Sequence, residues 1–293
     1  MTILTTKIYL RPVVDDGLDL GPSLERVAAA LRARECLADR SFDRFLPYEL
    51  WRVSRQFWTP LVVALRVAEW LDAFAIKTAV DIGAGAGKLC VASSLASRCD
   101  FTGLEQRPRL VEAARSLAQL FGVEDRVRFI QATVSQDRIP EAEAYYLYNP
   151  FGENLFGPHE HLDDEVELSH ERYRRDVASV ETFLHEAPVG TYVIKYNGFG
   201  GRMPASYEEV RVDRTMPNLL RMWRKARGRR TRSSAGTRGV RAGPHENQSC
   251  AVASARGSGP RSPARAPTTL FTEHLSRVWY HMRHDHSRTA RGR

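Results

Sequence analysis

The stretch that decides the fold is Thr78-Ala-Val-Asp-Ile-Gly-Ala-Gly-Ala-Gly-Lys-Leu-Cys90. Its first residues are apolar and suit a β-strand, which predicts a short buried strand ending at Asp81-Ile82. Three glycines then alternate with alanines, at Gly83, Gly85 and Gly87. Alternate glycines allow a tight turn in which a ligand can lie against bare main chain. The run from Lys88 to Ser97 favours a helix, so the N-terminus of this helix would face the ligand.

A second strand and helix follow at once. Asp100–Glu105 is typical of a strand that ends in a carboxylate, and Arg109–Phe121 has the pattern of a helix. Glu105 falls 22 positions after Gly83. In a doubly wound α/β fold, an acid at this position accepts hydrogen bonds from the ribose hydroxyls. The sequence therefore predicts an α/β protein with a doubly wound, mostly parallel, seven-stranded sheet.

The spacing of the glycines separates two cofactors. A dinucleotide fingerprint requires G-x-G-x-x-G, whereas this loop is G-x-G-x-G with Asp81 two residues before the first glycine. The pattern Asp-x-Gly-x-Gly-x-Gly resembles the first motif of class I S-adenosylmethionine-dependent methyltransferases. The resemblance implies S-adenosyl-L-methionine as cofactor, with Asp81 and the glycines at its methionine portion and Glu105 at its ribose. A nucleotide-dependent oxidoreductase of the Rossmann type is the alternative.

The third expected strand departs from the pattern of this family. Residues 125–134 alternate like a strand, and many members of the family end this strand in an acid that binds the adenine amino group. Here the strand ends in Gln131, Ala132 and Thr133. Gln131 or a backbone carbonyl would have to replace the acid.

Asn149-Pro150-Phe151 follows an apolar fourth strand that begins at Ala144. Ligands of doubly wound sheets gather at the carboxyl ends of the strands, so this tripeptide would lie beside the glycine loop. It resembles, with one proline fewer, the Asn-Pro-Pro-Tyr/Phe motif of methyltransferases that act on amino or amide nitrogen. The resemblance implies that Asn149 and the Pro150 carbonyl orient the amine and that Phe151 stacks on the substrate or the sulfonium. A plain turn at the end of the strand remains the alternative.

Thr59 and Pro60 precede the next expected helix, Leu61–Phe74. Thr59 would cap this helix and Pro60 would be its first residue. The sequence Phe-Trp-Thr-Pro60 also resembles a contact to the methionine end in several amino-methylating enzymes. A plain cap and a cap that also binds the ligand both remain open. Residues 1–54 are expected to form a helical cap on the main sheet.

His159-Glu-His161 and the acids after it are expected to begin a long solvated helix that runs to about Glu186. A metal site is the weaker interpretation, because a helix places residues i and i+2 on different faces. One histidine could instead line the substrate mouth. Three more strands are expected, within residues 188–198, 207–214 and 219–225, and they complete a methyltransferase domain over residues 55–226.

Charge and cysteine usage limit the remaining functions. From Arg221 onward the chain has 17 basic and 3 acidic residues, whereas residues 1–220 have 26 basic and 32 acidic residues. Residues 227–293 are expected to be a disordered basic tail, either a nucleic-acid-binding segment or the product of a frameshift. Four cysteines without CxxC spacing suggest neither a disulfide framework nor a zinc site. No apolar run has the length of a membrane span, so a cytoplasmic location is expected.

These observations predict a methyltransferase that transfers a methyl group to a nitrogen acceptor on a protein or a small molecule. The combination of glycine loop, Glu105 and Tyr-Asn-Pro-Phe151 also loosely resembles the non-SET histone-lysine methyltransferases. The sequence identifies neither the acceptor nor the oligomeric state. A non-catalytic protein that binds nucleic acid through its basic tail is the alternative from another class.

Overall fold

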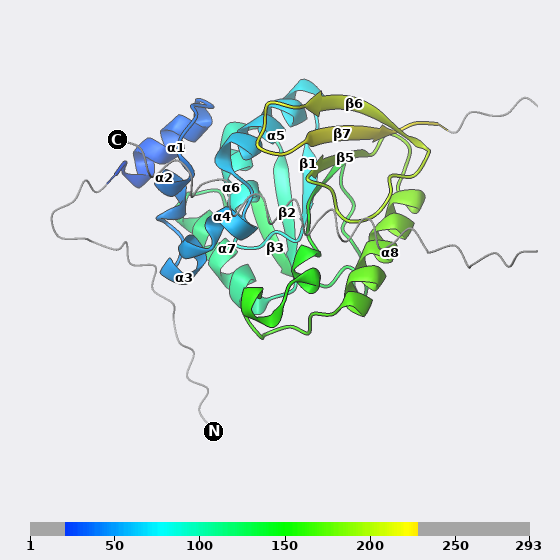
Figure 1. Cartoon of the computed structure of the whole chain (residues 1–293). Coiled ribbons are helices and arrows are strands. Elements are labelled where there is room, and N and C mark those ends of the chain that lie inside the picture. Colours follow the sequence, from blue (N-terminus) through cyan, green and yellow to red (C-terminus); the bar gives the residue numbers. More distant parts are fainter. Residues whose placement is uncertain (1–20, 228–293) are drawn as a thin grey trace, which may run out of the picture. The chain divides into compact units, whose positions relative to one another are not determined.

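The computed structural model describes residues 21–227 (Figure 1). Residues 1–20 of the expected N-terminal cap and the basic tail from residue 228 lie outside the described residues. The described part contains one seven-stranded sheet in the order β3-β2-β1-β4-β5-β7-β6. The strands are β1 Thr78–Ile82, β2 Asp100–Glu105, β3 Val127–Gln131, β4 Ala144–Tyr148, β5 Tyr192–Tyr196, β6 Tyr207–Asp213 and β7 Leu220–Lys225.

The topology of the sheet is doubly wound. Strands β1 to β5 pair in parallel, and β7 pairs antiparallel with both β5 and β6. The chain builds β1, β2 and β3 outward in one direction and then returns to place β4 on the other side of β1. This creates a switch point between β1 and β4, where ligands of such sheets bind. The predicted fold class is confirmed.

Helices cover both faces of the sheet (Figure 1). The helices are α1 Leu24–Arg32, α2 Asp39–Asp43, α3 Tyr48–Arg52, α4 Ser54–Phe57, α5 Leu61–Ala73, α6 Lys88–Ala96, α7 Pro108–Leu120 and α8 His170–Glu186, with 3₁₀ turns at Gly152–Leu155 and Pro158–Glu160. Alternate strand residues point to opposite faces. Ala79 and Tyr146 therefore join the core with α5, α6 and α7, whereas Val80 and Tyr145 join the core with α8.

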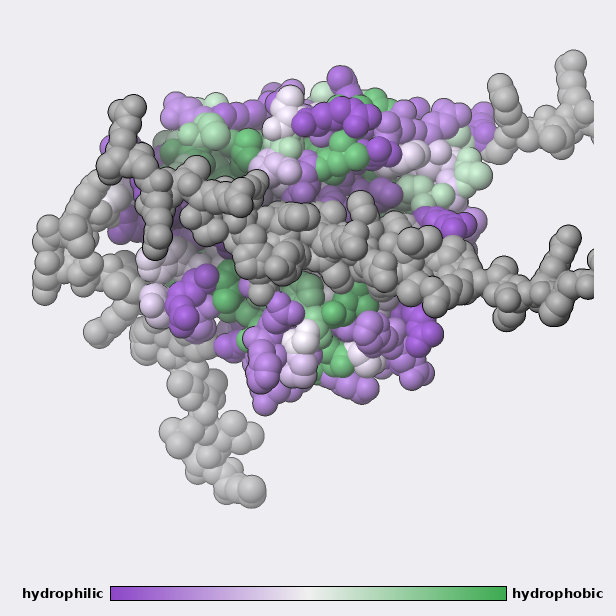
Figure 2. Space-filling view, viewed as in Figure 1, coloured by the Kyte–Doolittle hydropathy of each residue, from purple (hydrophilic) through white to green (hydrophobic). Residues whose placement is uncertain are grey.

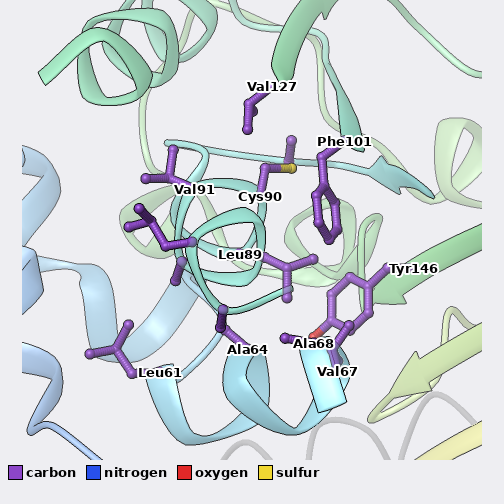
Figure 3. Packing of buried hydrophobic residues seen from close by; sticks show 14 of the residues in the cluster. Leu61, Ala64, Val67, Ala68, Leu89, Cys90, Val91, Phe101, Val127 and Tyr146 are labelled. Atoms are coloured by element: carbon purple, nitrogen blue, oxygen red, sulfur yellow. The ribbon is translucent and has the colours of Figure 1, made fainter. Parts of the chain in front are cut away.

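Helix α6 lies in the centre of the larger core. All nine of its residues are buried. Figure 3 shows Leu89, Cys90 and Val91 of this helix near α5 and near the strand residues Phe101 and Val127. Burial on all sides holds the start of α6 rigidly, and the glycine loop ends at that point.

The N-terminal helices α1 to α4 pack into the same core. Val27, Leu31 and Phe42 belong to the hydrophobic cluster that contains α6 and α7. The Phe42 ring stacks on Phe121 at a centroid distance of 4.9 Å. The helices expected before residue 55 are therefore present, while the domain boundary at residue 54 stays a prediction.

The long helix α8 begins later than expected. It starts at His170, with the Ser169 hydroxyl accepting from the Arg172 N–H, and not near His159. Residues 152–169 instead form two 3₁₀ turns and a loop. Asp163 in this loop accepts hydrogen bonds from Arg107 and Arg109, so it is held by distant residues and not by a helix.

The visible surface carries hydrophilic residues around smaller apolar areas (Figure 2). Scattered apolar groups are normal on protein surfaces. Within residues 21–227 none of the helices is long and apolar enough to span a membrane.

Candidate functional site

The glycine loop joins β1 to α6 at the switch point of the sheet. Gly83, Gly85 and Gly87 all have positive φ angles, of 82°, 54° and 79°. The loop is also closely packed, since a Cβ added to Gly83 would lie 2.8 Å from the Pro150 Cβ. A Cβ on Gly85 would collide with the Trp58 ring. Side chains at these positions would therefore strain the backbone and clash with the neighbouring segments.

A pocket whose empty space of about 300 Å³ includes open solvent lies beside this loop. Its walls come from the segment before α5, the glycine loop, the start of α6 and strand β4. The side chains that matter for its chemistry are Phe57, Thr59, Asp81, Lys88, Tyr146 and Tyr148. The pocket thus combines aromatic walls with a buried acid, Asp81, and with Lys88, whose ammonium group pairs with Asp39 and Asp43.

Asp81 is the buried acid of this cavity. Only 4% of its surface is exposed, and Cys90 Sγ is 3.5 Å from Asp81 Oδ2. Burial raises the pKa of Asp81 to about 7, and the nearby Glu105 carboxylate contributes to the increase. A cationic group of a bound ligand would strongly stabilise the ionised form of this buried carboxylate.

Glu105 lies at the end of β2 against the same loop. It is 6% exposed, and each carboxylate oxygen accepts one backbone N–H at 3.0 Å, from Gly85 and from Arg107. Burial raises the pKa of Glu105, and the two backbone hydrogen bonds act in the opposite direction. An ionised carboxylate has further lone pairs, so ribose hydroxyls could still donate to it.

Gln131 is placed next to Glu105 by the parallel register of β2 and β3. Its side chain is exposed, and its Nε2 lies 3.5 Å from the Gln106 carbonyl oxygen. It does not line the cavity beside Asp81. The structure therefore separates Gln131 from the residues around Asp81 and leaves it at the Glu105 end of the site.

The expectation that Thr59 caps α5 is wrong. Pro60 has φ −60° and ψ 145°, so helix α5 starts at Leu61 and Thr59 lies too early in the chain to cap it. The Leu61 N–H donates instead to Asp39 Oδ1 at 2.8 Å. The Thr59 hydroxyl lies 3.1 Å from the Tyr146 hydroxyl and lines the cavity.

Asn149 and Pro150 lie beside the glycine loop. Asn149 has a φ of +41°, and its N–H donates to the Gly198 carbonyl at 2.8 Å. Its side-chain carboxamide makes no hydrogen bond within the part of the chain that the structure describes. Phe151 points elsewhere: it is 7% exposed and belongs to the core beneath α8.

Two ion-pair clusters hold the segments around the site, and sequence reasoning missed both. Lys88 pairs with Asp39 and Asp43 and so fixes the N-terminal helices to the start of α6. Arg107 pairs with Glu153 and Asp163 and so fixes the loop after Phe151 beside Glu105. No motif spacing signals such pairs, because their members are far apart in the sequence. Among residues 21–227 no group of three or more potential ligands is arranged for a metal ion.

Comparisons with known proteins give only distant likenesses. No family model matches the chain, and no curated protein matches it. Among solved structures, an RNA methyltransferase from Salinibacter ruber in complex with S-adenosyl-L-homocysteine is 22% identical, with a TM-score of 0.43 over 57% of this chain and 93% of that one.

Two further solved structures are similar at the same level. The mitomycin 7-O-methyltransferase MmcR is 18% identical, with a TM-score of 0.43 over 70% of this chain and 61% of that one. TrmN from Thermus thermophilus is 14% identical, with a TM-score of 0.42 over 64% of this chain and 53% of that one. The chain thus spans less than two thirds of the last two proteins. These similarities concern the fold alone.

Proposed function

We propose that this protein is an S-adenosylmethionine-dependent methyltransferase. The observation that carries the proposal is the placement of two buried acids around one glycine loop. Asp81 ends β1 at the cavity, and Glu105 ends β2 against the Gly85 N–H. One acid is thus available for the amino group of the methionine portion and the other for the ribose hydroxyls. Gln131 would lie near the adenine.

The side chains around the cavity fit this cofactor. S-Adenosylmethionine carries a positively charged sulfonium, and aromatic faces attract cations. Phe57 and Tyr148 provide such faces on the cavity wall. The sulfonium supplies an activated methyl group and is a good leaving group. The protein therefore has to position the two reactants and exclude water, and strong acid–base catalysis is not required.

A nitrogen acceptor is favoured by the state of Asn149. Its carboxamide makes no hydrogen bond to another described residue, although it lies next to a loop in which Pro150 contacts Gly83. The Asn149 side-chain oxygen and the Pro150 carbonyl could both accept N–H bonds from an amine and so direct its lone pair at the methyl group. Phe151, whose ring is in the core, would serve mainly to anchor this motif.

The two alternatives explain less of the site. A nucleotide-dependent oxidoreductase would use the glycine loop and Glu105 but would leave the carboxamide of Asn149 without a role. A protein that binds nucleic acid through its tail would need none of these buried acids.

Methyl transfer tests the proposal directly. The purified chain is incubated with radiolabelled methyl donor and fractions of cell extract, and transfer to a nitrogen-containing product is expected. Asn149→Gly removes the carboxamide and keeps a residue that tolerates the positive φ. We expect this variant to bind the cofactor normally and to lose most transfer. Full transfer by this variant would contradict the assignment of Asn149.

A further inference from the structure

Two large aromatic side chains lie exposed next to each other on helix α3. Tyr48 is 56% exposed and Trp51 is 38% exposed, and their ring centroids are 6.0 Å apart. Single exposed apolar residues are normal on a protein surface and need no explanation. A tyrosine and a tryptophan that contact each other and the solvent are a different case, because rings of this size bury a large apolar area when they bind a partner.

Arginine side chains accompany the two rings. The guanidinium carbon of Arg52 lies 5.8 Å from the centre of the Tyr48 ring. Tyr48, Trp51 and Arg52 stand at positions i, i+3 and i+4 of one helix, so they share a face. Val53 keeps nearly helical angles (φ −100°, ψ 1°), which brings Arg55 of α4 round to the same side. These four exposed residues, Tyr48, Trp51, Arg52 and Arg55, are called the α3–α4 surface below.

The charge of the α3–α4 surface is positive. Arg52 and Arg55 are exposed, and neither makes an ion pair with another described residue. The acid between the two rings in the sequence, Glu49, turns towards α7, where it lines a small pocket together with Arg109. Guanidinium groups bind phosphates and also stack on flat aromatic groups. Two unpaired guanidinium groups beside two aromatic rings therefore suit a partner that is both anionic and aromatic.

The α3–α4 surface is firmly attached to the pocket beside the glycine loop. The inner side of the same segment is buried at Leu50 and Ser54, each 2% exposed. The Leu50 carbonyl accepts a hydrogen bond of 3.0 Å from Trp58 Nε1. Trp58 and its neighbour Phe57 line the pocket. A polymer bound to the outer side of this segment would therefore lie next to the pocket.

Single-stranded nucleic acid fits this surface better than the other partners. Proteins that bind single strands combine cationic groups for the phosphates with exposed aromatic rings on which the bases stack. A duplex keeps its bases stacked inside and would leave both rings unused. An acidic peptide would pair with the arginines but offers the rings no planar partner. A second copy of the chain in a symmetric contact would bring the same unpaired cations together.

We propose that the α3–α4 surface binds single-stranded nucleic acid, with bases stacked on Tyr48 and Trp51 and phosphates held by Arg52 and Arg55. The binding goes beyond the proposed function and does not depend on it. Where both hold, a base of the bound strand supplies the nitrogen acceptor. The basic residues from Arg221 onward are a separate source of phosphate contacts, so stacking has to be measured apart from charge.

The test compares two labelled oligonucleotides of about twelve nucleotides, a length within the usual range of single-strand sites. One carries bases and the other is abasic throughout, so the two have the same phosphate charge. In anisotropy titrations the full chain should bind the oligonucleotide with bases at least about 25-fold more tightly, which corresponds to two stacked bases. Tyr48→Ala and Trp51→Ala should each reduce this ratio about fivefold or more. Arg55→Gln should weaken the binding of both oligonucleotides by the same factor.

Val189→Ala is the control variant, because Val189 is an apolar residue that is 55% exposed outside the α3–α4 surface. It should leave the ratio unchanged, and the melting temperature and S-adenosylhomocysteine affinity of each variant show that it is folded. Equal affinity of the wild type for the two oligonucleotides, or no binding of either, would overturn the proposal and leave the proposed function intact. A ratio that survives in Tyr48→Ala/Trp51→Ala would do the same.

Two further outcomes separate this inference from its alternatives. A wild-type dimer in analytical ultracentrifugation that dissociates in Trp51→Ala would overturn the proposal, because a second copy of the chain would then cover the α3–α4 surface. A wild type that shows the expected ratio but binds no S-adenosylhomocysteine would support the surface and overturn the proposed function alone.

Discussion

Replacing Asp81 with asparagine should make the empty protein more stable at alkaline pH and unable to bind its ligand well. The pKa of Asp81 is raised from 3.8 to about 7 by burial, so the folded chain holds this proton more tightly than the unfolded chain. Protonated Asp81 therefore adds to the free energy of unfolding. This contribution is complete below about pH 4 and is lost as the pH rises through about 7. The amide side chain of the variant Asp81→Asn carries no charge at any pH, so the variant would escape this loss.

The size of the effect follows from the two pKa values. The two pKa values differ by about three, and each pKa unit corresponds to about 1.4 kcal/mol, so the largest possible loss of stability is about 4 kcal/mol. Water entering the cavity and residual structure in the unfolded chain reduce such values, so we expect a gain of about 1–3 kcal/mol at about pH 8. At about pH 5 the wild-type carboxyl is already protonated, and the variant should gain much less.

Urea denaturation under these acidic and alkaline conditions measures this difference. The exposed Asp164 provides a matched control, because Asp164→Asn removes a carboxylate that makes no hydrogen bond or ion pair with another described residue. The control should show no comparable gain in alkaline buffer. A variant Asp81→Asn that is equally or less stable than the wild type there would refute the claim that Asp81 is costly to ionise.

Three further predictions concern the cofactor, the acceptor and the tail. Glu105→Ala should weaken S-adenosylhomocysteine binding by about 1.5–3 kcal/mol in calorimetry, because the ribose hydroxyls lose a charged acceptor; unchanged affinity would contradict this role. Asn149→Ala should remove most methyl transfer with nearly unchanged cofactor affinity, and a larger loss of stability than Asn149→Gly is expected from its positive φ. A chain ending after Ala226 should keep its melting temperature and cofactor affinity, since the last strand ends at Lys225; a marked fall in either would show that the remaining residues contribute to the fold. Sequencing the gene across codons 220–235 tests the frameshift hypothesis separately.

The sheet could be predicted from the sequence because its signals are local. Asp100–Glu105 is a strand with the predicted bounds. The glycine loop and the acid at the end of β2 also follow from spacing within one βαβ unit. These local features are enough to place Asp81, Glu105 and Asn149 at one edge of the sheet.

The parts that could not be predicted depend on contacts between distant residues. Lys88 meets Asp39 across 49 positions of sequence, and no motif connects them. The late start of α8 reflects the pairing of Asp163 with Arg107, which competes with a helix near His159. Phe151 turns into the core because the chain bends after β4, and the alternation within a strand does not extend past its end. Side-chain direction at loops is set by tertiary packing.

The most direct test of the central claim is a calorimetric titration of the wild-type chain with S-adenosylhomocysteine, followed by NAD on a fresh sample. The arrangement of Asp81, the glycine loop and Glu105 predicts saturable binding of S-adenosylhomocysteine at one site per chain, and no binding of NAD at the same concentrations. Saturable NAD binding without binding of S-adenosylhomocysteine would contradict the methyltransferase assignment.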